Sequence, residues 1–261
     1  MTIKQLQNLL LLCSLFVVIW LGIGLFAHFH ALFIWGAAAA LLVMMLIYLG
    51  LSEEKTPLWY GVLVEKNRNR ASLSRLQVTL WTVVIISAYL AVALIRTMPE
   101  ALDPPAPDCQ ETDEDDCTPQ PLNIAFPNEI WLALGISTVS FAGSSLIKTN
   151  KRNKYQANLL AQPSPETAII PYQAKEPKIR DIFYGDDVGN QDTIDLSKVQ
   201  MFFFTVALIT VYSFAIGSFI TNDALIRAPH TFEFPAFSSS MTVILAISHA
   251  GYLFIKGPGG K

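Results

Sequence analysis

The amino-acid sequence predicts an all-α integral membrane protein with six transmembrane helices, arranged as an N-terminal hairpin followed by two parallel two-helix repeats. Of the 261 residues, 52% are hydrophobic and only 15% are charged, whereas a soluble domain carries about a quarter charged residues. The charges are also excluded from apolar runs of about 20 residues, the length that a helix needs to cross the hydrocarbon core of a bilayer. The net charge of −3 gives no indication of nucleic-acid binding.

Six apolar segments satisfy the length requirement, and none contains an Asp, Glu, Lys or Arg. We expect helices, because an isolated strand would leave its backbone groups unpaired in lipid, and each run is about twice as long as a barrel strand. The first segment is interpreted as a retained helix rather than a cleaved signal peptide, because its apolar run is long and lacks a good cleavage site. The segments are Leu9–Phe26, Ala31–Leu51, Leu76–Ile95, Ile130–Ile147, Val199–Ile220 and Ser238–Ile255.

The positive charges predict an orientation for these spans. If the segment before the first span is cytoplasmic, every Lys and Arg except Arg96 and Arg227 falls on the cytoplasmic side. Such an asymmetry is typical of membrane proteins that follow the positive-inside rule. We therefore expect a multi-pass protein of the bacterial inner membrane, with both termini cytoplasmic and the lipid bilayer as its surroundings.

The spans and loops divide the sequence into four regions. Residues 1–51 form the N-terminal hairpin, and residues 52–148 form the first repeat with its cytoplasmic lead-in and acidic outer loop. Residues 149–182 form a cytoplasmic linker, and residues 183–261 form the second repeat. The loop that contains the linker is rich in proline, which predicts an extended, partly ordered connection rather than a separate enzyme domain.

An internal repeat is the most informative feature of the sequence. Ser72–Val83 aligns with Asp195–Val206, and Leu134–Ser137 aligns with Leu245–Ser248 further along. Both copies would enter the membrane from the cytoplasm, so they are parallel repeats related by an axis along the membrane normal. The polar residues that recur are Ser74, Gln77, Thr82 and Tyr89 in the first copy, and Ser197, Gln200, Thr205 and Tyr212 in the second.

These recurring polar residues are interpreted first as structural. The Ser-x-x-Gln at residues 74–77 and 197–200 fits the capping box of a helix start, and Ser72 and Asp195 are suitable N-caps. Arg75 and Lys198 are expected to extend to the lipid phosphates at the cytoplasmic surface. A ligand or partner site built from the same residues is the open alternative.

A Leu-Ser-Arg/Lys-x-Gln motif followed by a Gly/Ala-Ile-Ser helix resembles the pattern of uncharacterised bacterial polytopic membrane proteins. The resemblance covers Trp59 to Lys256, that is, both repeat units. It implies the two-helix repeat as the unit of the fold, and it implies no particular activity.

His249 is the only residue within the predicted spans that titrates near neutral pH. An ionisable residue in a membrane span suggests a function such as a proton relay. However, none of the spans contains a carboxylate that could pair with it. A neutral histidine that is hydrogen-bonded inside the bundle is therefore favoured, and the sequence predicts neither a metal site nor a cofactor.

Three function classes are compatible with this organisation to different degrees. A non-enzymatic membrane subunit, acting as anchor or scaffold for a partner complex or as a homo-oligomer, is favoured by the absence of charge within the spans and the small soluble mass. The alternative is a channel or carrier for a small solute or ion, built on the parallel repeat. An enzyme is disfavoured, because the sequence shows no convergent acid, base and nucleophile.

Cys109 and Cys117 flank an acidic segment of the predicted outer loop. Because that side of a bacterial membrane is oxidising, we expect these cysteines to form a disulfide. The acidic segment lacks the spaced ligands of a calcium loop, so it is interpreted as a solvated loop closed by the bridge. Mass spectrometry after alkylation without reduction should find both cysteines unmodified by the alkylating agent. Alkylation of both without a reductant would contradict the disulfide.

Overall fold

The computed structural model contains two compact units, each assembled from separate parts of the chain. Unit 1 comprises residues 1–49, 81–130 and 209–236, and unit 2 comprises residues 50–80, 131–208 and 237–261. The residues that the structure describes are 3–26, 31–51, 60–65, 68–97, 122, 124–161, 173–187, 189–222 and 233–256.

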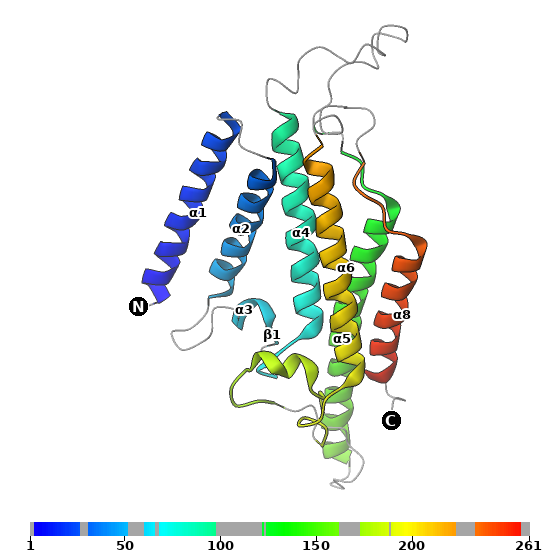
Figure 1. Ribbon diagram of the computed structural model, residues 1–261. Coiled ribbons are helices and arrows are strands. Elements are labelled where there is room, and N and C mark those ends of the chain that lie inside the picture. Colours follow the sequence, from blue (N-terminus) through cyan, green and yellow to red (C-terminus); the bar gives the residue numbers. More distant parts are fainter. Residues whose placement is uncertain are drawn as a thin grey trace. The chain divides into compact units, whose positions relative to one another are not determined.

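Long helices dominate the described residues, as the apolar runs predict (Figure 1). They are α1 (Ile3–Phe26), α2 (Ala31–Gly50), α4 (Leu73–Arg96), α5 (Asn128–Ala161), α6 (Leu196–Ile220) and α8 (Ser239–Lys256). Among the described residues, four helices are long and apolar enough to cross a membrane: α2, α4, α6 and the first part of α5. In α1 and α8 the apolar stretches are shorter. The four helices agree with the predicted class of an all-α membrane protein.

Helix α5 is longer than the predicted span. It contains 34 residues, which corresponds to about 50 Å at 1.5 Å per residue, and it continues without a break to Ala161 (Figure 1). The chain is therefore helical over residues 149–161, where the sequence analysis expects the extended linker to begin. The prolines that indicated an extended chain start only at Pro163, so none of them interrupts this part of the helix.

The starts of α4 and α6 follow from the residues that precede them. The Asp195 carboxylate accepts hydrogen bonds from the amides of Ser197 (3.0 Å) and Lys198 (3.4 Å), as an N-cap residue does. Ser72 precedes α4, and its carbonyl accepts the first helical hydrogen bond, from the amide of Leu76 at 3.1 Å. Both residues thus occupy the N-cap positions that the sequence predicts.

Unit 1 is held together by apolar packing and one polar contact between α2 and α4. Ile34 and Ala91 form the centre of an apolar cluster, and the indole Nε1 of Trp35 donates to the Oγ of Ser87 at 2.9 Å. Elsewhere in this unit, Phe126 stacks on Phe234 with ring centroids 4.6 Å apart and planes 3° from parallel. The N-terminal hairpin is therefore joined to the first repeat by a partly buried hydrogen bond as well as by apolar contact.

Unit 2 adds short elements to the helices. They are α3 (Tyr60–Leu63), β1 (Val64–Glu65), β2 (Arg70–Ala71) and the 3₁₀ helix η4 (Ile179–Phe183). β1 and β2 pair as an antiparallel hairpin, and β2 packs against η4. The apolar core of unit 2 consists of Ala71, Leu73, Ile182, Met201 and Tyr252. This core joins β2 and η4 to the helices α4, α6 and α8.

We predict that Asp195→Ala destabilises the start of α6 by about 1 kcal/mol, the usual effect of removing an N-cap side chain. Asp195→Asn should keep most of the stability, because the amide oxygen can still accept from the helix amides. Thermal unfolding of the full chain in detergent measures the difference. Equal loss in both variants would show that the charge of Asp195, rather than its capping hydrogen bonds, stabilises the helix.

Candidate functional site

Two groups of polar residues in unit 2 are candidates for a functional site. The first, here named the cap, consists of the described residues within 64–71 and 173–195. Asn69 holds the two segments of the cap together. The backbone of Asn69 lies in the left-handed region (φ 51°), which asparagine tolerates better than most residues. Its Nδ2 donates to the carbonyls of Ala174 (3.2 Å) and Lys175 (2.9 Å). The turn of the hairpin is therefore fixed to the start of the second segment.

Asp186 lies at the centre of the cap and pairs with two buried cations. Its Oδ1 is 2.9 Å from the Nη1 of Arg68 and 2.9 Å from the Nζ of Lys198. The cationic side chains are only 6% and 4% exposed, and the carboxylate side chain is 18% exposed. Lys198 also donates to the carbonyl of Tyr184 at 2.5 Å. Charges removed from water need close partners and further hydrogen bonds of this kind to remain stable.

The prediction that Lys198 extends to lipid phosphates is wrong, because its ammonium group is directed into the cap. The two arginines of the hairpin also donate to the backbone of the second segment: Arg68 to the carbonyl of Asp186, and Arg70 to the carbonyl of Gly185 at 2.5 Å. Planar guanidinium groups with several fixed donors suit such multiple acceptors. The loop before α6 is thus held by three buried basic residues.

Gly185 is required by the close approach of the chain to itself in this loop. A Cβ at this position would collide with the carbonyl and side chain of Asn190. The loop is closed by hydrogen bonds from the amide of Gly185 to the carbonyl of Thr193 (3.0 Å) and from the amide of Asp187 to the Oδ1 of Asn190 (2.9 Å). The glycine therefore permits the tight loop that presents Asp186 to the cations.

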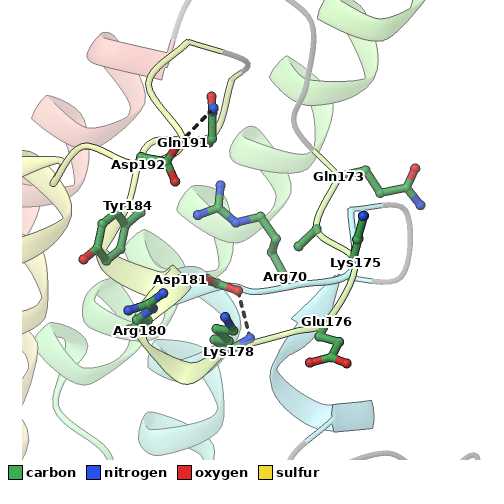
Figure 2. A pocket seen from close by; sticks show the side chains of 11 residues that line it. Arg70, Gln173, Lys175, Glu176, Lys178, Arg180, Asp181, Tyr184, Gln191 and Asp192 are labelled. Atoms are coloured by element: carbon green, nitrogen blue, oxygen red, sulfur yellow. Dashed lines mark hydrogen bonds between the residues drawn. The ribbon is translucent and has the colours of Figure 1, made fainter.

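A polar pocket of about 510 Å³ opens beside this ion-pair group. Figure 2 shows Arg70 extending between the segment that carries Gln173 and Lys175 and the loop that carries Gln191 and Asp192. Arg70 is only 4% exposed and forms a buried part of the lining. The other charged residues of the lining are Lys175, Glu176, Lys178, Arg180, Asp181 and Asp192.

The second group, here named the buried polar cluster, links the helices of unit 2. Ser74 of α4 donates to the hydroxyl of Tyr252 in α8 at 3.3 Å. Gln77 of α4 donates through Nε2 to the Oγ1 of Thr205 in α6 at 2.5 Å. The Nδ1 of His249 in α8 lies 2.8 Å from the Oγ of Ser140 in α5. Side-chain hydrogen bonds thus connect each of these helices to at least one other.

The predicted capping boxes are wrong. Ser74 and Gln77 bond to other helices rather than to the first turn of their own, and the Oγ of Ser197 bonds to the Asp195 carboxylate at 2.5 Å. The spacing alone predicted a hydrogen bond within the first turn. In the folded chain, long-range partners take the side chains of Ser74 and Gln77, and the N-cap carboxylate of Asp195 takes the hydroxyl of Ser197.

Matched residues of the two repeats lie in different surroundings. Gln77 is 1% exposed, whereas Gln200 lies on an exposed part of α6. Thr205 is buried, whereas Thr82 is exposed. Likewise Ser74 is fully buried and Ser197 only partly, while Tyr212 is buried and Tyr89 half-buried. The structure thus brings Gln77 and Thr205 together, and their counterparts do not form an equivalent buried pair among the described residues.

His249 is buried, with 2% of its surface exposed. Its Nδ1 has the contact to Ser140, and its Nε2 has no hydrogen-bond partner among the described residues. The same holds for the Oε1 of Gln77 and for the Oγ atoms of Ser137 and Ser248, two serines at matching positions of the repeats. The structure therefore agrees with a hydrogen-bonded histidine inside the bundle and adds several buried polar atoms with unused hydrogen-bonding capacity.

Sequence reasoning did not find the cap. Arg68 and Arg70 entered there only as charges that set the orientation of the chain, and Lys198 was assigned to the lipid phosphates. The available signal was the occurrence of basic residues just before α4 and in the first turn of α6, together with Asp186 in the loop that precedes α6. Pairing across more than 100 residues is not encoded in any local spacing, so the partners could not be assigned.

Cys109 and Cys117 lie outside the described residues, and the described part of the chain contains one cysteine, Cys13, which is free. The predicted disulfide therefore stays a prediction. No group of three or more His, Cys, Asp or Glu side chains suited to a metal ion occurs within the described residues.

The chain matches no protein-family model, no curated protein and no solved structure in the comparisons with known proteins.

We predict that Asp186→Asn loosens the cap, because it leaves Arg68 and Lys198 buried without their shared negative charge. The expected loss of stability is on the order of 2–3 kcal/mol, since breaking a buried ion pair leaves charge uncompensated. Hydrogen exchange of the full chain in detergent should show faster exchange in residues 173–195. Asp187→Asn, at a neighbouring position of the same loop, is the control, and equal effects of both changes would contradict the central role of Asp186.

Proposed function

We propose that this chain is a non-enzymatic membrane subunit that anchors a partner complex through its cap. In this proposal the chain has six membrane helices, lies in a bacterial inner membrane with both termini cytoplasmic, and presents the cap to the cytoplasm. The supporting observation is the ion-pair group around Asp186, which orders loops that would otherwise be extended. An ordered surface loses less conformational entropy when a partner binds to it than a flexible loop does.

The surface of the cap supports a protein as the partner. Ile179 is 56% exposed and Ile194 is 59% exposed, and both lie among charged residues. Apolar side chains surrounded by a polar rim are typical of protein interfaces, in which a few central residues contribute most of the affinity. Lys175, Glu176 and Lys178 provide charges of both signs near Ile179 in the sequence, which suits a partner of complementary charge.

The test is stoichiometric co-purification of the partner with the full chain from native membranes, compared between matched variants. Ile179→Asp should abolish the co-purification, because it places a charge at the centre of the proposed interface. Leu122→Asp is the control, because Leu122 is similarly exposed (63%) and lies in a predicted outer loop. A partner retained equally by both variants, or a wild-type chain that purifies with no stoichiometric partner, would contradict the proposal.

A channel or carrier for a small solute or ion is the second candidate function. The observation that favours it is the buried polar cluster, in which Gln77, Ser137, Ser248 and His249 retain unused polar atoms inside apolar helices. Such atoms can bind a permeating polar species in place of its water. Flux into liposomes that contain the purified wild-type chain, lost in Gln77→Leu, would favour this function over the scaffold.

A further inference from the structure

We propose that the pocket of the cap binds a ligand through a phosphate group. The pocket has a polar lining, a volume of about 510 Å³ and a buried guanidinium, that of Arg70. A pocket of this size accommodates a small molecule or a headgroup rather than a single inorganic ion alone. Its cations come from both segments of the cap, so the site exists only when the cap is folded.

The cations at the mouth of the pocket are available to a ligand. Lys175, Lys178 and Arg180 are exposed and form no ion pair with a carboxylate among the described residues. Arg180 lies over the ring of Tyr184, with its guanidinium carbon 5.9 Å from the ring centroid. Such a stacked guanidinium still has its in-plane donors free to bind phosphate oxygens in a bidentate manner.

The lining carries four cationic side chains, including Arg70, and three carboxylates, so its net formal charge is +1. The Oδ2 of Asp181 accepts from the amide of Lys178 at 2.9 Å, and the Oδ2 of Asp192 accepts from the Nε2 of Gln191 at 3.2 Å. Glu176 projects away from Arg70 in Figure 2. Asp181 and Asp192 therefore have hydrogen-bond donors within the cap, and the lining keeps an excess of one cationic side chain.

The position of the pocket allows two sources for the phosphate group. Arg70 is in β2, and α4 begins at Leu73, so this part of the lining lies within a few residues of a helix that is long and apolar enough to cross a membrane. Basic pockets at the cytoplasmic ends of such helices bind anionic lipid headgroups. A soluble phosphate monoester offers the same oxygens to the same cations.

Binding can be measured on the full chain by thermal unfolding in a neutral detergent after removal of lipid. One arm adds inorganic phosphate or glycerol 3-phosphate, and the other places the chain in phosphatidylcholine nanodiscs with or without phosphatidic acid. Chloride at equal ionic strength controls for screening. We expect stabilisation in at least one arm, and the arm that responds identifies a soluble or a lipid source.

The matched variants test whether the pocket is responsible. The double change Lys175→Gln and Lys178→Gln should weaken binding at least fivefold without unfolding the chain, because both side chains are exposed. Lys178→Arg, which keeps the charge, should bind nearly as well as the wild type. Arg75→Gln removes one positive charge from a residue outside the lining and should leave binding unchanged. Absence of stabilisation in both arms, or equal weakening by Arg75→Gln and the double change, would overturn the proposal.

Discussion

The shared carboxylate of Asp186 determines the arrangement of the loops in unit 2. Arg68 belongs to the hairpin before α4, and Lys198 belongs to the first turn of α6, so one acidic group fixes two helix starts through their basic neighbours. Both cationic side chains are almost fully buried, and burying either charge without a partner would cost free energy. Arg70 adds a donor to the Gly185 carbonyl next to Asp186, and the loop that carries Asp186 is closed by the hydrogen bond from Gly185 to Thr193.

The helices of unit 2 also bury polar side chains that need partners, but these side chains are neutral and are paired by hydrogen bonds. In an apolar environment a side-chain hydrogen bond contributes modestly, on average about 0.6 kcal/mol, so bonds such as that from Gln77 to Thr205 specify which helices pair more than they stabilise the bundle. Small buried residues in α5, such as Ser137 and Ser140, allow α8 to approach α5 closely. The charged cap and the neutral cluster therefore make different contributions: the cap orders loops, and the cluster selects helix neighbours.

The helices could be predicted from the sequence because a bilayer requires a long run of apolar residues, and that requirement is visible residue by residue. The N-cap positions of Ser72 and Asp195 were predictable for a similar reason, since capping is local. The continuation of α5 to Ala161 could not be predicted, because a polar segment has no apolar run from which the length of a helix can be estimated. Gln77 was assigned wrongly to its own helix start, because its actual partner Thr205 is brought near only by the tertiary fold. Lys198 was assigned wrongly to the lipid phosphates, because the fold of the preceding loop that brings Asp186 to it has no sequence pattern of its own.

The repeat shows why equal sequence does not ensure equal structure. Phe126 and Phe234, each followed by proline, stack on one another although they lie three residues out of register in the alignment of the two copies. Ser87 is buried and accepts from Trp35 of the N-terminal hairpin, while its counterpart Thr210 is exposed. The hairpin lies outside the repeat, and the side-chain hydrogen bond described for it, from Trp35 to Ser87, is made with the first copy. A bundle with one additional neighbour on one side cannot keep both copies in the same surroundings, so a polar residue in the second copy is left on the surface. Each half of a duplicated motif therefore has to be assigned its role separately, from its own contacts.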